Sequence, residues 1–130
     1  MRTVLAHGVF DLLHSGHIKH LEQARQFGDE LIVSVVADRH VSKPYLINDQ
    51  DTRRYMLETL RCVNSTVLCD APGPEYILNQ LRPTVYARND EYLDRMKPEY
   101  EVCRRLGILL GFTHTQPPHT SDLISRIKDL

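Results

Sequence analysis

The sequence predicts an α/β fold of the Rossmann-like type, with a parallel five-stranded sheet and helices on both of its faces. Short apolar runs, several rich in β-branched residues, alternate along the chain with longer segments whose apolar residues recur at helical spacing. Polar loops, several of which contain glycine or proline, separate these segments. This strand–helix alternation favours parallel pairing, because each helix returns the chain to the end of the sheet at which all the strands begin.

The N-terminal part of the chain shows the alternation most clearly. Thr3–Ala6 is a short apolar run that predicts a buried strand. A helix is predicted to begin after Ser15, whose hydroxyl suits an N-cap, and to end near Gly28. The β-branched run Glu30–Ala37 predicts a second strand, and the polar residues 38–48 predict a loop.

The remaining segments repeat this order. Further strands are predicted at Ser65–Cys69, Thr84–Ala87 and Ile108–Phe112, and further helices at Asp49–Val63, Gly73–Leu81, Lys97–Leu106 and Thr120–Leu130. Because ligands of such sheets bind beyond the carboxyl ends of the strands, we expect residues 7–17, 38–48, 88–91 and 113–121 to surround one crevice. No repeat or composition shift divides the chain, so residues 1–130 are predicted to form a single domain.

The composition narrows the class of partner. The 16 basic and 17 acidic residues leave a net charge of −1, which argues against a nucleic-acid-binding surface or a polybasic membrane anchor. The three cysteines form no C-x-x-C pair, which favours a reducing compartment. No apolar run has the length of a signal peptide or a transmembrane helix, and we expect a cytoplasmic protein.

The loop after the first predicted strand has the features of a phosphate site. Ser15 and Gly16 begin a helix whose free N–H groups attract anions, and Gly16 allows a ligand to approach the backbone. His14 and His17 are three residues apart, so both rings can face one point and donate hydrogen bonds to phosphate oxygens. A zinc site that includes His20 is the alternative, and it would need further ligands.

The stretch "GVFDLLHSGH" (residues 8–17) resembles the signature of the cytidylyltransferase-like branch of the HIGH-motif nucleotidyltransferases. Members of this branch include glycerol-3-phosphate cytidylyltransferase, heptose-phosphate adenylyltransferase domains and archaeal FAD synthetases. The resemblance continues at compatible spacings through "INDQDTRRYMLETLRCV", "LRPTVYARNDEY" and "HTSDLISRI". It implies a nucleotidyltransferase that moves a nucleoside monophosphate from a nucleoside triphosphate to a small phosphorylated acceptor, such as a sugar or polyol phosphate, and releases pyrophosphate.

The resemblance also implies roles for individual residues. The catalytic residues would be His14, His17 and Lys43. The nucleotide would contact Gly8, Phe10, Asp11, Gly16, Arg88, Asn89, Asp90, Tyr92, His114, His119, Thr120 and Ser121. The acceptor would contact Asp38, Lys43, Arg53 and Arg61. Mg²⁺ would arrive with the triphosphate, without a confident protein ligand, and a homodimer is expected.

Simpler structural roles stay open for several of these residues. Asp11 could orient its loop rather than the Mg²⁺-bound triphosphate, and Lys43 could be a solvated loop lysine. Arg53 and Arg61 could lie on a solvated helix face or at a dimer contact. Thr120 suits ordinary N-capping of the last predicted helix as well as phosphate binding.

The chain departs from the family pattern at positions that bear on substrate choice. Arg88 and Asn89 take the places of a lysine and a glycine, and His119 that of a serine, while His114 lies where several relatives have an arginine. Because stand-alone chains of this length resemble the cytidylyltransferases, the resemblance favours CMP as the transferred group, with AMP as the alternative. A nucleotide-binding module with little or no turnover is the alternative function.

Overall fold

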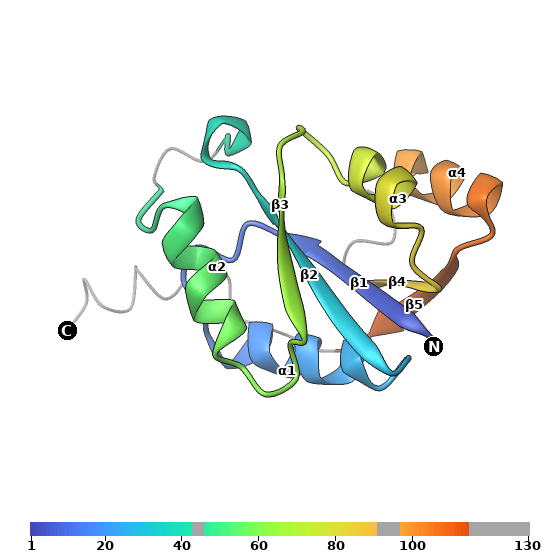
Figure 1. The fold of residues 1–130 in the computed structure, drawn as a ribbon, viewed down its shortest axis with the longest axis horizontal. Helices are drawn as coiled ribbons and strands as arrows, with labels where there is room; N and C mark the ends of the chain where they lie inside the picture. The colour runs from blue at the N-terminus through green and yellow to red at the C-terminus, as the bar shows by residue number, and fades with distance from the viewer. Residues whose placement is uncertain (43–45, 91–96, 115–130) are drawn as a thin grey trace.

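The computed structural model describes residues 1–42, 46–90 and 97–114. Its five strands are β1 (Thr3–Gly8), β2 (Glu30–Val36), β3 (Ser65–Cys69), β4 (Val85–Asn89) and β5 (Leu109–Thr113). They form one sheet in the order β3-β2-β1-β4-β5, and every neighbouring pair is parallel. The predicted five-stranded parallel sheet is therefore confirmed (Figure 1).

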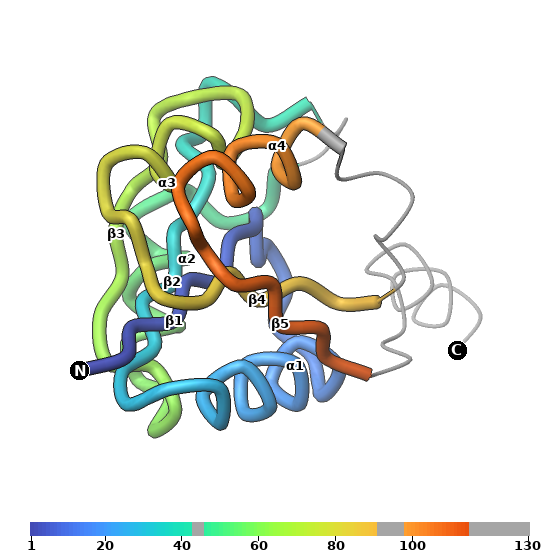
Figure 2. Tube along the Cα trace, turned by 90° about the vertical axis from the view of Figure 1, so that its right-hand side faces the viewer, coloured from blue at the N-terminus to red at the C-terminus, as the bar shows by residue number. Residues whose placement is uncertain are grey.

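Helices cover both faces of this sheet (Figures 1 and 2). On one face, α1 (Ser15–Arg25) and α2 (Gln50–Glu58) bury Leu21, Ala24 and Leu57 against the alternate side chains of the central strands. On the other face, α3 (Glu75–Leu81) and α4 (Lys97–Leu106) pack Ile77, Leu78 and Cys103 against Leu5 and Tyr86. The two faces use alternate residues of each strand, because successive strand side chains point to opposite sides.

The strand order creates a switch point beside β1. The chain runs outward from β1 to β2 and β3, and then returns to place β4 on the opposite side of β1. The registers Val4↔Val85 and Ala6↔Ala87 bring the carboxyl ends of β1 and β4 together. In sheets of this type a ligand binds beyond the carboxyl ends of the strands at such a point, because the connections on its two sides cross to opposite faces of the sheet. We call this region, beyond the ends of β1 and β4, the crevice.

Several predicted boundaries need correction. Helix α2 ends at Glu58, not at Val63, because residues after Thr59 turn and the Thr59 hydroxyl donates to the Met56 carbonyl at 2.6 Å. Strand β1 extends beyond Ala6 to Gly8. The loop predicted after β2 begins with a 3₁₀ turn, η1 (Asp38–His40). The helix predicted at Thr120–Leu130 lies outside the described residues.

Gly107 ends α4 with a positive φ of 71°, a conformation that glycine adopts without steric cost.

Within the described part of the chain, no helix has the length and apolar character needed to cross a lipid bilayer.

Candidate functional site

The N-terminus of α1 is capped by two histidines at the end of the β1–α1 loop. His14, not the predicted Ser15, is the N-cap residue, because its backbone is extended and its side chain reaches the first turn. The Nδ1 atom of His14 accepts hydrogen bonds from the N–H groups of Gly16 at 3.1 Å and His17 at 3.4 Å. In return, Nδ1 of His17 accepts from the N–H group of His14 at 3.3 Å. The two residues form a reciprocal capping box.

This capping box sets the tautomer of both rings. A ring nitrogen that accepts a hydrogen bond carries no proton, so the neutral ring of each histidine has its N–H at Nε2. The rings of His14 and His17 are stacked, with centroids 3.8 Å apart and planes 24° apart. The spacing predicted that both rings would face one point, and the structure places them side by side.

Gly8 and Phe10 support this arrangement from the end of β1. Phe10 has a positive φ of 52° and meets the ring of His17 edge-on, with centroids 5.6 Å apart. A Cβ atom on Gly8 would lie 2.9 Å from Cε2 of Phe10, so a larger residue would displace the aromatic ring. Both residues act here through packing, and the nucleotide contact expected of them stays a prediction.

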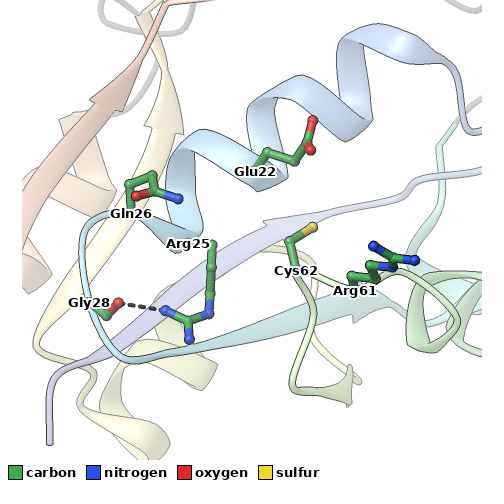
Figure 3. Close-up of a pocket in the computed structure, with 6 residues that line it drawn as sticks. All are labelled: Glu22, Arg25, Gln26, Gly28, Arg61 and Cys62. Carbon is green, nitrogen blue, oxygen red and sulfur yellow. Dashed lines mark hydrogen bonds between the residues drawn. The ribbon is translucent and has the colours of Figure 1, made fainter.

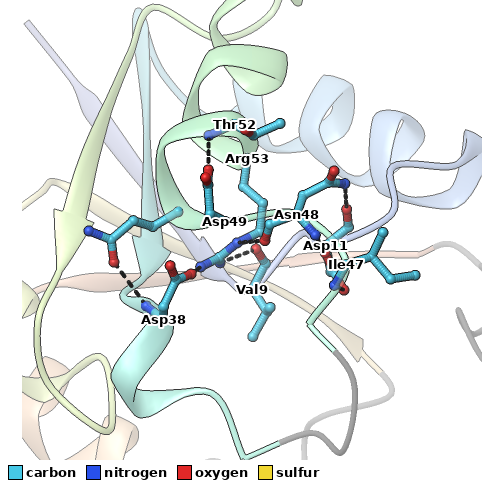
Figure 4. Close-up of polar contacts among 9 residues, drawn as sticks. Val9, Asp11, Asp38, Ile47, Asn48, Asp49, Thr52 and Arg53 are labelled. Carbon is cyan, nitrogen blue, oxygen red and sulfur yellow. Dashed lines mark hydrogen bonds and ion pairs between the residues drawn. The ribbon is translucent and has the colours of Figure 1, made fainter.

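Asp11 joins the β1–α1 loop to the segment before α2 (Figure 4). Its carboxylate accepts hydrogen bonds from the N–H groups of Ile47 at 2.9 Å and Asn48 at 2.8 Å. The Asn48 side-chain amide donates back to the Asp11 carbonyl at 2.7 Å. Of the two roles left open for Asp11, the described contacts support orientation of the loops.

Arg53 requires a correction, because it is not a surface residue of α2. Its side chain is fully buried, and its guanidinium group donates to the carbonyls of Val9 at 2.7 Å and Asn48 at 3.1 Å and to Oδ1 of Asp38 at 2.7 Å (Figure 4). The solvated-face interpretation is wrong. All three guanidinium nitrogens face protein oxygens, so in this structure Arg53 holds the loops around the crevice and does not present its fork to an acceptor.

Arg61 does not lie at the crevice, where the acceptor role predicted for it would place it. It follows α2 and lies with Arg25, Gly28 and Cys62 at the end of the sheet where β2 begins (Figure 3). The capped end of α1 and the carboxyl ends of the strands lie at the opposite end (Figure 1). Within one copy of the chain, the structure does not bring Arg61 to the crevice. The elongated helical pattern of Asp49–Val63 suggested a placement that the turn after Glu58 removes.

The end of β4 carries a partly buried positive charge, that of Arg88. Nη1 of Arg88 donates to the carbonyl of His7 at 3.3 Å, and Nε lies 3.6 Å from Oε2 of Glu99 on α4. On the other face of the same strand, the Asn89 side chain donates to the Thr113 hydroxyl at 3.5 Å. The structure therefore places Arg88 and Asn89 at the switch point, as the strand order requires.

Asp90 and His114 lie just beyond the ends of β4 and β5. Nδ1 of His114 is 2.8 Å from Oδ2 of Asp90, and the backbone N–H of His114 donates to the side chain of Gln23 on α1 at 2.8 Å. The His114 side chain is 74% exposed, so this pair forms an outer edge of the crevice.

His20 belongs to the packing between α1 and the sheet. Its Nδ1 lies 2.5 Å from the hydroxyl of the buried Thr113, and burial and the charge of Arg88 lower the pKa of His20 to about 4. His7 bonds to Ser34 at 2.7 Å, and the same two causes lower its pKa to about 4. No group of three metal-ligating side chains occurs among the residues that the structure describes, so the predicted zinc alternative gains no support.

Five predicted site residues lie outside the described residues: Lys43, Tyr92, His119, Thr120 and Ser121. The structure adds Tyr86 and Glu99, which sequence reasoning missed, and gives contacts to Asn48 and Thr113, which lie in the predicted loops but had no individual role; each bonds to a predicted site residue or shares a partner with one. Asn48 precedes the Asp49 N-cap of α2, and this position beside a helix start was the available signal.

Comparison with known proteins places the chain in a family. The sequence model described as cytidylyltransferase-like matches residues 5–121. The chain belongs to the cytidylyltransferase-like family. The enzyme class expected from the sequence, a nucleotidyltransferase, is thereby confirmed, and with it the transfer of a nucleoside monophosphate from a nucleoside triphosphate.

Three individual proteins and one further fold match illustrate what this cytidylyltransferase-like chain is similar to. It is 36% identical to an FAD synthase of Aciduliprofundum boonei over 95% of this chain and 84% of that protein. It is 37% identical to the bifunctional protein HldE of Aliarcobacter butzleri over 98% of this chain, but spans only 27% of that longer protein. A lipopolysaccharide core biosynthesis protein from Thermoplasma volcanium, of known crystal structure, matches with a TM-score of 0.74 and 28% identity over 92% of this chain and 99% of that one. Pantothenate synthetase of Thermus thermophilus, at 13% identity and a TM-score of 0.61, shares the fold.

Proposed function

We propose that this chain transfers a nucleoside monophosphate from a nucleoside triphosphate to a small phosphorylated acceptor, such as a sugar or polyol phosphate. The observation that carries the proposal is the stacked pair His14 and His17 at the N-terminus of α1, directly beyond the carboxyl end of β1. A helix N-terminus attracts phosphate, and this one lies beside the switch point between β1 and β4.

In the proposed reaction, an oxygen of the acceptor phosphate attacks the α-phosphorus of the nucleotide. A new P–O–P linkage forms as the bond to the β-phosphate breaks, and pyrophosphate leaves with both electrons of that bond. The Nε2–H groups of His14 and His17 donate to phosphate oxygens whose negative charge grows in the transition state. Each such donor is worth on the order of 3 kcal/mol when it is fixed in place beforehand, and the capping box fixes both rings.

Mg²⁺ belongs to this proposal as an ion that travels with the triphosphate. When bound, it neutralises charge on the phosphates and eases the departure of pyrophosphate. The described residues fit an ion held mainly by nucleotide oxygens, since both carboxylate oxygens of Asp11 already accept backbone N–H groups. Asp11 then acts by holding the β1–α1 loop in place.

The transferred group is proposed to be AMP, with CMP, which the resemblance to the cytidylyltransferases favoured, as the alternative. The support is the likeness to an FAD synthase, since FAD contains an adenosine monophosphate unit. The same likeness supports a phosphate on a polyol chain as acceptor, because the other half of FAD, flavin mononucleotide, carries its phosphate on a ribityl chain. The planar group of Arg88 at the switch point suits stacking against a base or hydrogen bonding to it.

The test is pyrophosphate release from ATP or CTP with Mg²⁺ and a panel of acceptors: flavin mononucleotide, glycerol 3-phosphate and sugar 1-phosphates. We expect release that needs an acceptor, prefers ATP and falls at least a hundredfold in H17A. Nucleotide binding without pyrophosphate from any acceptor would favour the binding module. Stoichiometric zinc that is lost in H20A would favour the metal-binding alternative.

The expected homodimer stays a prediction, and analytical ultracentrifugation of the same preparation checks it. Because Arg61 lies away from the crevice of its own copy, the acceptor role expected of it would need a second copy of the chain.

A further inference from the structure

A buried polar cluster connects α4 to the crevice, and the proposed reaction does not yet use it. It consists of Tyr86 and Arg88 on β4 and Glu99 in the first turn of α4. Tyr86 and Arg88 are two residues apart on one strand, so both side chains point to the face that α3 and α4 cover. Arg88 lies beyond the last β1–β4 backbone partner, Ala87, and therefore at the switch point itself.

The contacts in this cluster lead from Tyr86 through Glu99 to Arg88. The hydroxyl of the fully buried Tyr86 donates to Oε2 of Glu99 at 2.7 Å. The same carboxylate oxygen lies 3.6 Å from Nε of Arg88, and Nη1 of Arg88 donates to the His7 carbonyl at 3.3 Å. Tyr86 therefore fixes Glu99 by a hydrogen bond, Glu99 faces the Nε edge of the guanidinium group as an ion-pair partner at 3.6 Å, and the end of β1 accepts a hydrogen bond from Nη1.

Burial makes the cluster costly unless it serves a purpose. The Arg88 and Glu99 side chains are only 17% and 13% exposed, and ion pairs at such depth usually gain little net stability over apolar residues. Burial raises the pKa of Glu99, and the charge of Arg88 and the Tyr86 hydrogen bond oppose that rise. The charge of Arg88 extends to the crevice side, where it helps to lower the pKa of His7 and His20.

We infer that Glu99 and Tyr86 are positioning residues that hold the guanidinium group of Arg88 in the orientation that binds the nucleoside triphosphate. The inference rests on the proposed function and deepens it, since it assigns a support to a residue of the nucleotide site. Tyr86 and Glu99 touch Arg88 or one another in this cluster, and they act on the nucleotide through Arg88.

The sign of the expected effect separates positioning from general electrostatics. E99Q removes a negative charge near a site for a polyanion, so long-range electrostatics alone would tighten nucleotide binding. If Glu99 positions Arg88, the same change weakens binding instead, because the guanidinium group loses the partner that orients it. We expect the Kd for ATP to rise by about three- to tenfold in E99Q and by less in Y86F, which deletes one hydrogen bond.

The experiment measures ATP and CTP binding by calorimetry for the full chain, E99Q, R88M and the double variant E99Q/R88M. If Glu99 acts through Arg88, E99Q changes the Kd in the wild-type background and has no effect in the R88M background. The matched control is E101Q on the same helix, because Glu101 pairs with Arg104 at the surface and both side chains are largely exposed. E101Q is expected to leave the Kd unchanged, and thermal melting verifies that each variant is folded.

Two kinds of result would overturn the inference. Unchanged or tighter binding in folded E99Q, or an equal loss with and without Arg88, would show that Glu99 does not position Arg88. Failure of the wild-type chain to bind either nucleotide would reject the proposed function, and the inference with it. Normal wild-type binding together with an inert Glu99 would reject the inference alone.

Discussion

Arg53 offers the sharpest test of how this fold holds its crevice together. In R53M, the side chain keeps most of its buried length but loses three hydrogen bonds, to Val9, Asn48 and Asp38. The Asp38 carboxylate is 38% exposed and regains water when its partner is lost, whereas the two backbone carbonyls lose donors that came from a fully buried group.

The magnitude follows from these three contacts. Removal of one partner of a buried ion pair costs about 3–5 kcal/mol, and the exposure of Asp38 places this case at the lower end. The Val9 and Asn48 carbonyls lie in partly buried hydrogen bonds, so water and small shifts of the loops replace most of what they lose and add little to this cost. We expect R53M to lower the free energy of unfolding by about 3 kcal/mol, and the melting temperature by roughly 10 °C.

Urea unfolding followed by circular dichroism measures this loss, and R39M is the matched control. Arg39 also contacts a carboxylate through two nitrogens, each 2.6 Å from Asp70, but its side chain is 71% exposed. R39M is therefore expected to leave the urea midpoint unchanged within error. Equal urea midpoints for R53M and R39M would refute the reasoning, because the buried contacts of Arg53 would then contribute nothing to the free energy of unfolding.

Three further predictions follow from the described contacts. G8A is expected to cost about 1–3 kcal/mol in urea unfolding, because its Cβ would lie 2.9 Å from the Phe10 ring; an unchanged midpoint would show that the ring moves freely. H14N is expected to keep the melting temperature, since asparagine caps helices well, but to slow pyrophosphate release about a hundredfold; parallel losses of stability and rate would contradict this split. His7 and His20 have pKa values of about 4 in the fold against 6.5 when unfolded, so the unfolded chain binds more protons and stability falls as pH decreases from 6.5 toward 4; H20L should flatten this acid limb, and an unchanged limb would argue against a buried neutral ring.

The sequence predicted the elements of the fold well because their signals are local. Strand–helix alternation and apolar spacing are properties of neighbouring residues, and they sufficed for the five parallel strands and the described helices. The predicted end of α2 was wrong because the signal used for it was also local. Leu60 and Val63 continue the helical spacing of apolar residues, but in the structure a turn carries them into the core. Spacing cannot distinguish these two ways of burying a side chain.

In the candidate site, too, contacts between neighbouring residues could be predicted and contacts between distant segments could not. The sequence by itself predicted that His14 and His17 lie together, because residues three apart at a helix start are neighbours. Their reciprocal capping and stacking became visible only in the structure, where Phe10 packs against His17. Only the tertiary structure decided the partners of Arg53 and Arg88. Arg53 meets Val9 across 44 residues. Arg88 meets His7 because β4 returns to the side of β1, and it meets Glu99 because α4 packs on the face of β4 to which Arg88 points. A long charged side chain is buried only where distant backbone supplies its acceptors, and the order of the strands determines which backbone that is.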